Sequence, residues 1–185
     1  MDRRRFVLAA LGAGSATVAT PWPGSAAAAT EDDLAFANFG ASTELLVKDF
    51  YARAIDAELV SGQTGALKHG RAAAGWHAKA QSDLLTSFGD VAPLPEDFEF
   101  EWPARTFRTR PAMVATGLAV LRALRGVYQT AAAMASEQSY RVLYASLAAS
   151  VSQQIVALGG AAAAEPFPLA LDIETASDAI ERYFG

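Results

Sequence analysis

Cysteine is absent from the 185 residues of this chain, and histidine is nearly absent, since His69 and His77 are the only two. The lack of cysteine excludes disulfides, thiolate metal sites, a cysteine nucleophile and a lipid-modified N-terminal cysteine. With two histidines, the usual pairings of a nucleophile with a histidine base are almost unavailable. No serine elbow, P-loop, dinucleotide fingerprint or zinc signature occurs either. Stability must therefore come from packing alone, and no motif indicates catalysis.

Basic charge is scarce as well. The chain holds 15 Lys and Arg against 20 Asp and Glu, which gives a net charge of −5. Three of the arginines lie with one aspartate in the first 29 residues, so removal of that segment leaves a net charge of −7. A domain this acidic is a poor candidate for binding nucleic acid or an anionic lipid surface. We therefore expect no nucleic-acid partner.

The first 29 residues have the pattern of an export signal. Arginines at positions 3–5 precede an apolar run from Phe6 to about Ala19, and small residues fill positions 24–29. This order is typical of a leader that is cleaved near Ala29. The run is too short and too rich in glycine to span a bilayer as a stable helix. The pattern predicts a leader over residues 1–29 and a mature domain over residues 30–185 without a stable membrane anchor; a retained N-terminal anchor is the alternative.

The arginine pair suggests a particular export route. Arg3 and Arg4, with Phe6 two residues further on, resemble a twin-arginine (Tat) signal, although Asp2 and Leu8 depart from its usual pattern. The twin-arginine route carries proteins that are already folded. The resemblance implies that the protein works in the periplasm, in the cell envelope or outside the cell.

Long helical segments account for most of the mature chain, and no strand pattern of any length occurs. Helices are predicted over residues 30–62, 63–88, 111–134 and about 139–159, with a short terminal helix over residues 172–184. Thr30 suits a helix cap and Pro111 suits a first helical turn, whereas Pro93, Pro95 and Pro103 exclude a helix between the second and third segments. Two helical hairpins joined by one long connection are the topology of a ferritin-like bundle. The expected fold is therefore an all-α, ferritin-like four-helix bundle with one long crossover between helices two and three, plus a short C-terminal helix.

Glu44 is the only charged residue from position 34 to position 47. A carboxylate on a long apolar helix face is costly unless another group pairs with it. The register of the two hairpins predicts that five side chains lie level with it in one central layer: Ala78, Gln81, Leu121, Val151 and Gln154. Any chemistry at the centre of the bundle is expected in this layer.

The segments Asn38–Glu44 and Asp49–Tyr51 resemble the first helix of secreted bacterial ferritin-like proteins, a group that includes desiccation-related members. Residues 120–128, 143–158 and 167–176 resemble that family's third helix, fourth helix and tail. Metal-binding members of the wider family hold iron or manganese with a Glu on helix one, Glu-x-x-His on helix two, a Glu on helix three and Glu-x-x-His on helix four. The resemblance therefore identifies the positions at which metal ligands are expected.

Carried over position by position, this ligand set is almost empty. Glu44 survives, but the other positions fall at Ala78, Gln81, Leu121, Val151 and Gln154, which are aliphatic residues or neutral amides. Residues 111–160 contain a single acid, Glu137, which is expected in a loop, and no histidine. A di-metal centre with ligands from all four helices is therefore excluded by composition, and we expect no cofactor.

Two interpretations of Glu44 stay open. It could hold one iron or manganese ion together with His77, which lies within a helical turn of its level, and with Gln81. It could instead be a structural remnant with a raised pKa. The side chains that could satisfy it are Gln81, Gln154, Tyr128 and Arg125. His69 is expected to be a solvated surface residue.

Three functions correspond to these interpretations. The one we favour is an exported, non-catalytic component that stabilises or binds another protein, either a ferritin-like relative or a second copy of itself. The second is a metal-dependent oxidoreductase or metal store that uses Glu44 and His77. The third is a small-ligand carrier with a cavity where metal ions are held in relatives.

The crossover carries more aromatic residues than a solvated loop needs, namely Phe98, Phe100, Trp102 and Phe107. We expect these rings to fasten the crossover to the bundle, with a binding role as the alternative.

Overall fold

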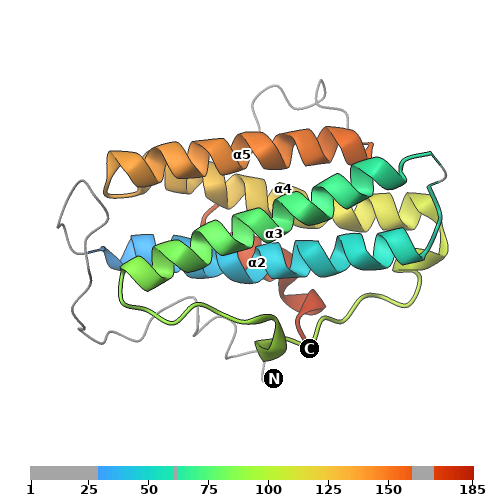
Figure 1. Ribbon diagram of the computed structural model, residues 1–185, viewed down its shortest axis with the longest axis horizontal. Coiled ribbons are helices and arrows are strands. Elements are labelled where there is room, and N and C mark those ends of the chain that lie inside the picture. Colours follow the sequence, from blue (N-terminus) through green and yellow to red (C-terminus); the bar gives the residue numbers. More distant parts are fainter. Residues whose placement is uncertain (1–28, 61, 160–168) are drawn as a thin grey trace.

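The computed structural model describes residues 29–60, 62–159 and 169–185, which form a bundle of four long helices and one short helix (Figure 1). The long helices are α2 (Glu31–Asp56), α3 (Thr64–Ser87), α4 (Arg110–Met134) and α5 (Gln138–Leu158), and the short one is α6 (Ile173–Ile180). These described ranges contain no β-strand, although an isolated bridge pairs Phe100 with Phe184. The predicted all-α bundle is confirmed.

The order of the helices along the chain produces two antiparallel hairpins. α2 packs along α3, and α4 packs along α5. Residues 88–109 then run the length of the bundle, so that α4 begins at the end where α3 also begins (Figure 1). Two short 3₁₀ turns, Pro95–Asp97 and Thr106–Arg108, interrupt this connection. The single long crossover between the second and third helices is therefore confirmed.

Most helix ends follow local capping, with one departure from the prediction. α2 begins at a capping box, in which Thr30 Oγ1 accepts a hydrogen bond from the backbone N–H of Asp33. α5 ends at Gly159, whose φ of 109° lies in the left-handed region that favours glycine. The prediction that the first helix continues to residue 62 is wrong. α2 stops at Asp56 because the chain must reverse before α3, and Glu58, with a φ of 52°, cannot continue a right-handed helix.

Asp33 also ties the start of α2 to the other hairpin. Its side chain is buried and accepts hydrogen bonds from the backbone N–H and the hydroxyl of Ser136, which lies in the turn between α4 and α5. Burial pushes the pKa of Asp33 upward, but the hydrogen bonds from Ser136 and Thr30 outweigh this and leave the pKa below its usual value. This carboxylate therefore fixes the two hairpins together at one end of the bundle.

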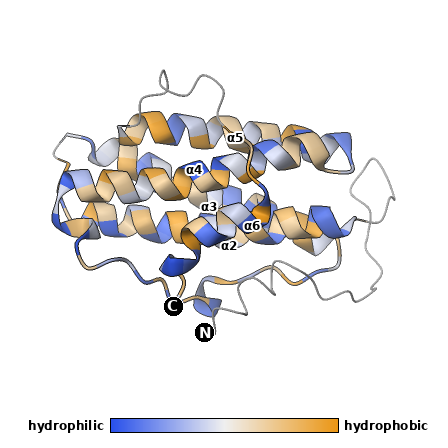
Figure 2. Cartoon of the chain, turned by 180° about the vertical axis from the view of Figure 1, so that it is seen from behind, coloured by the Kyte–Doolittle hydropathy of each residue, from blue (hydrophilic) through white to orange (hydrophobic). Residues whose placement is uncertain are grey.

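Hydrophobic and hydrophilic bands alternate along each long helix, as expected for helices that each bury one face (Figure 2). The buried faces meet in one core, and close helix packing there depends on glycine at several positions, of which Gly70 and Gly117 are examples. A Cβ atom at Gly70 would lie 2.5 Å from the ring of Tyr51, and one at Gly117 would lie 2.4 Å from the ring of Phe50. Aromatic rings of α2 thus lie directly against the backbones of α3 and α4.

Aromatic side chains fasten the crossover to the bundle, as predicted. The ring of Trp102 lies 5.5 Å from that of Phe50 on α2 and 5.0 Å from that of Tyr183, measured between centroids. Its indole Nε1–H donates a hydrogen bond of 2.6 Å to Asp49. Phe107 packs on the same Phe50 ring at 5.7 Å. The connection is therefore held by both packing and a charge-assisted hydrogen bond.

The C-terminal segment pairs with the crossover after a short helix. The prediction of a helix over residues 172–184 is therefore too long, because α6 stops earlier and a 3₁₀ turn (Glu181–Tyr183) follows. The backbone N–H of Glu101 donates to the carbonyl of Tyr183, and that of Gly185 donates to the carbonyl of Glu99. These bonds hold the final residues in an extended conformation that a helix cannot adopt.

Candidate functional site

Glu44 lies on α2 at the centre of the bundle, with no exposed surface. Its Oε1 atom accepts a hydrogen bond of 2.9 Å from the hydroxyl of Tyr128 on α4. The Nδ1 atom of His77 on α3 lies 2.9 Å from the same oxygen. The second oxygen, Oε2, is buried and has no hydrogen-bond partner in the described part of the chain. Side chains of α3 and α4 therefore contact the same oxygen of a carboxylate that α2 carries.

The buried environment alters the protonation of this cluster. Burial raises the pKa of Glu44, while the hydrogen bond and charge of His77 and the hydrogen bond of Tyr128 oppose that rise. Burial also raises the pKa of Tyr128, and the negative charge of Glu44 adds to the effect. The Tyr128 phenol therefore remains protonated and acts as a hydrogen-bond donor. The cluster has the chemistry of a carboxylate held in place by two donors.

His77 has 11 % of its side chain exposed, so the imidazole bridges the surface and the buried carboxylate. When Nδ1 carries the proton, it donates to Glu44. Sequence register placed His77 within a turn of Glu44, and the structure brings the two side chains into contact. His69 lies elsewhere on α3 and is exposed.

Gln81 is fully buried on α3 but does not hold Glu44. Its Oε1 atom accepts a long hydrogen bond, 3.4 Å, from the hydroxyl of Tyr144 on α5, and its Nε2 atom has no partner among the described residues. A Cβ atom at Gly40 would lie 2.7 Å from Nε2 of Gln81, so this side chain needs glycine opposite it on α2. Tyr144 was not among the predicted residues, although it lies seven residues before Val151 and therefore on the same face of α5.

The remaining positions of the predicted central layer are buried and mostly aliphatic. They are Ala78, Leu121, Val151 and Gln154. α4 and α5 contain no acidic residue and no histidine along their whole length. In the described ranges, no group of three or more acidic or histidine side chains is arranged to hold a metal ion. Glu44 and His77 thus supply one carboxylate and one imidazole, and α4 and α5 supply neither group.

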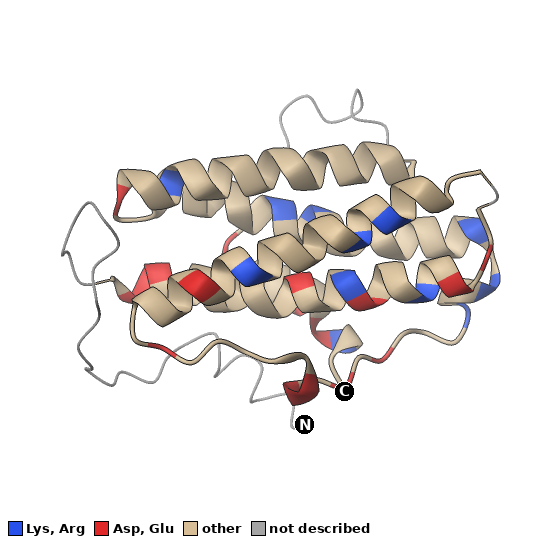
Figure 3. Ribbon diagram, viewed as in Figure 1, with Lys and Arg blue, Asp and Glu red and all other residues tan. Residues whose placement is uncertain are grey.

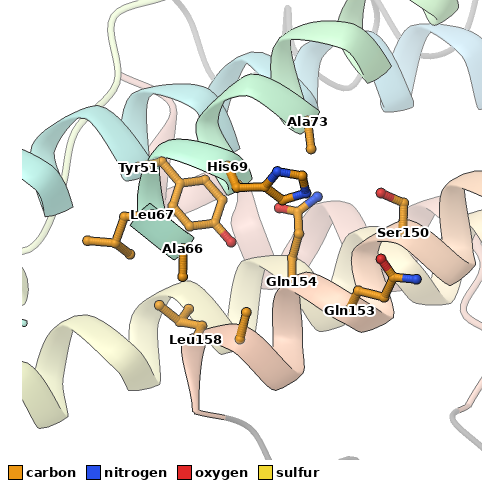
Figure 4. Close-up of a pocket in the computed structure, with 11 residues that line it drawn as sticks. Tyr51, Ala66, Leu67, His69, Ala73, Ser150, Gln153, Gln154 and Leu158 are labelled. Carbon is orange, nitrogen blue, oxygen red and sulfur yellow. The ribbon is translucent and has the colours of Figure 1, made fainter. Parts of the chain in front are cut away.

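A pocket of about 120 Å³ lies beside this layer, between the first half of α3 and the last half of α5 (Figure 4). Tyr51, His69 and Gln154 extend toward the same space, and Gln154 is the member of the predicted layer that lines it. Both amide atoms of Gln154 are buried without a partner in the described part of the chain. We expected a cavity at the positions where relatives carry metal ligands. The pocket instead lies closer to the turn between α2 and α3.

Other sequence predictions fall where the structure gives no test. The leader, with Arg3, Arg4 and Phe6, and the proline-rich break at residues 166–168 lie outside the described residues. Among the helices that are described, none combines the length and the apolar character needed to cross a membrane.

Comparison with protein-family models, with curated proteins and with solved structures finds no significant match.

Proposed function

We propose that the chain is an exported ferritin-like protein that lacks a di-metal site and acts without catalysis, as an interaction or stabilising component. The observation that carries this proposal is that side chains of this protein already contact the Glu44 carboxylate. Tyr128 and His77 already engage one of its oxygens, and α4 and α5 offer no further carboxylate or imidazole. The proposed export rests on the leader, with its Arg3, Arg4 and Phe6 pattern.

The outer face of α5 supports a role in binding another protein. Residues 142–158 contain no charged side chain. In Figure 3, α5 is therefore tan along its length, apart from one blue band near its start. Val142 and Val156 on this face are 58 % and 49 % exposed. An exposed helix face without charges is unusual on an acidic protein and is typical of a contact surface. The partner we favour is another helical bundle, namely a ferritin-like relative that retains metal ligands.

The experiment compares partner recovery by chains altered at this face. The full-length protein is expressed in its native host, cross-linked in the envelope and culture fluid, and isolated. We expect Val142→Lys and Val156→Lys to abolish recovery of a specific helical partner without loss of helicity. Val91→Lys is the matched control, because Val91 is 85 % exposed on the crossover, away from α5. Equal recovery by all variants, or no partner in repeated isolations, contradicts the proposal; recovery of only this chain identifies self-association.

A second candidate, a metal-dependent oxidoreductase or metal store, rests on the free oxygen of Glu44. Oε2 has no partner in the described residues, and His77 lies against the same carboxylate. Carboxylate and imidazole groups suit iron or manganese. Titration of purified protein with Mn²⁺, followed by electron paramagnetic resonance, tests this candidate. Stoichiometric binding that Glu44→Gln and His77→Ala both remove would favour it over the non-catalytic function.

A further inference from the structure

The pocket beside the central layer has the size of a small-molecule site. Its volume of about 120 Å³ is slightly below the roughly 150 Å³ of a buried cavity that accepts one benzene molecule. Most of its wall is apolar, formed by side chains such as Ala66, Ala73 and Leu158. A few polar groups enter it from three helices, as is usual in sites that bind small molecules.

Gln154 is the group in this pocket that lacks a partner. The residue is 5 % exposed, and neither Oε1 nor Nε2 forms a hydrogen bond within the described part of the chain. A buried amide that leaves both its donor and its acceptor unpaired is costly, so native proteins almost always satisfy such groups. Figure 4 shows the side chain directed into the pocket, toward His69 and close to Tyr51. Both amide atoms have almost no accessible surface, so a small rotation of the amide about its terminal torsion is needed to present the acceptor and the donor side by side to a ligand.

The charges around the pocket favour a neutral ligand. No Lys, Arg, Asp or Glu is among the lining residues, so neither an anion nor a cation finds a permanent counter-charge there. Burial, and then the negative charge of Glu44, raise the pKa of Tyr51, so its hydroxyl stays protonated. The same negative charge would repel an anionic ligand.

We propose that this pocket binds a small, mostly apolar, uncharged molecule that carries an adjacent hydrogen-bond donor and acceptor, such as a lactam or a primary carboxamide. The amide of Gln154 pairs with that group through two parallel hydrogen bonds. The apolar part of the ligand lies against the alanine and leucine side chains. The site is distinct from the Glu44 cluster and does not depend on the proposed partner-binding function.

The first experiment uses three probes of similar size with the purified full-length protein. 2-Pyrrolidinone carries the donor and acceptor, cyclopentanone has the same ring but lacks the donor, and propionate is an anion. Binding is followed through the side-chain amide signal of Gln154 in ¹H–¹⁵N NMR spectra. We expect saturable binding of 2-pyrrolidinone, about tenfold tighter than that of cyclopentanone. Equal affinities, tighter binding of propionate, or no saturable shift, which would mean that the pocket holds water only, overturn the proposal.

The second experiment uses two variants that alter the pocket in different ways. Gln154→Leu removes the polar pair at similar volume, and we expect 2-pyrrolidinone to bind at least about tenfold more weakly. Ala73→Leu fills the space from α3 and should abolish binding of both cyclic probes. Ala72→Leu is the matched control, since this neighbouring residue is exposed and does not line the pocket. Unchanged affinity in Gln154→Leu, or an equal loss in Ala72→Leu, would contradict the assignment.

Discussion

Replacement of Tyr128 by Phe tests how Glu44 is held. The substitution removes only the hydroxyl that donates 2.9 Å to Oε1 of Glu44. Neither side chain has exposed surface, so water cannot readily replace the lost donor. A hydrogen bond to a charged group is worth about 1.5–3 kcal/mol. We therefore expect the free energy of unfolding to fall by about 2 kcal/mol at pH 8, where the carboxylate is most ionised.

Urea denaturation followed by circular dichroism measures this loss. Tyr144→Phe is the matched control, because that hydroxyl is equally buried but forms a long bond of 3.4 Å to the neutral amide of Gln81. Its loss should be about 0.5–1 kcal/mol. The Tyr128→Phe effect should also shrink when Glu44→Gln is already present. Equal losses in the two Phe variants, or an unchanged loss in the Glu44→Gln background, would refute the reasoning.

Three further predictions concern other polar contacts. Because burial raises the pKa of Glu44, the folded state binds the proton on this carboxyl more tightly than the unfolded state does. The free energy of unfolding therefore falls as the pH rises from about 4.5 through the raised pKa. Glu44→Gln should lack this fall in urea denaturation between pH 4 and pH 8, and the same pH dependence in both proteins would contradict the prediction. Asp33→Ala removes the bonds to Ser136 and the capping-box bond from the backbone N–H of Thr30. It should cost about 2 kcal/mol at pH 7 in thermal unfolding, with less loss below the lowered pKa of this carboxyl. A loss independent of pH would exclude the ionised carboxylate as the cause. Trp102→Phe keeps an aromatic ring but removes the hydrogen bond to Asp49. It should lower the free energy of unfolding by about 1–2 kcal/mol and speed proteolysis within the crossover. Unchanged proteolysis would show that this bond does not hold the crossover.

The helices and their connectivity could be predicted because their signals are local. Thr30 forms the predicted cap of α2, Pro111 lies in the first turn of α4, and Gly159 ends α5 in a left-handed conformation. The prolines between residues 93 and 103 excluded a helix, and a crossover of that length leads to one topology. The exact end of α2 could not be predicted, since residues 57–60 have helical composition and the positive φ of Glu58 depends on how the hairpin closes.

The candidate site could be predicted only in part. Helix spacing placed His77 within a turn of Glu44, whereas Tyr128 was only one of four side chains named as able to satisfy the carboxylate. Helix spacing did not identify which candidate touches the carboxylate, since that depends on side-chain rotamers and on close approach at positions such as Gly40. The place of the pocket at Gln154 could not be predicted either, because it depends on how side chains of α2, α3 and α5 fit together, and no sequence pattern reports that fit.

The metal content of the protein recovered from its native compartment tests the central claim most directly. The measurement is elemental analysis of the exported chain, purified without chelators, beside a Glu44→Gln variant prepared in the same way. We predict no stoichiometric iron or manganese in either protein, because two side chains already engage one oxygen of Glu44 and because α4 and α5 supply no carboxylate or imidazole. One or more iron or manganese ions per chain, lost in the Glu44→Gln variant, would contradict the account.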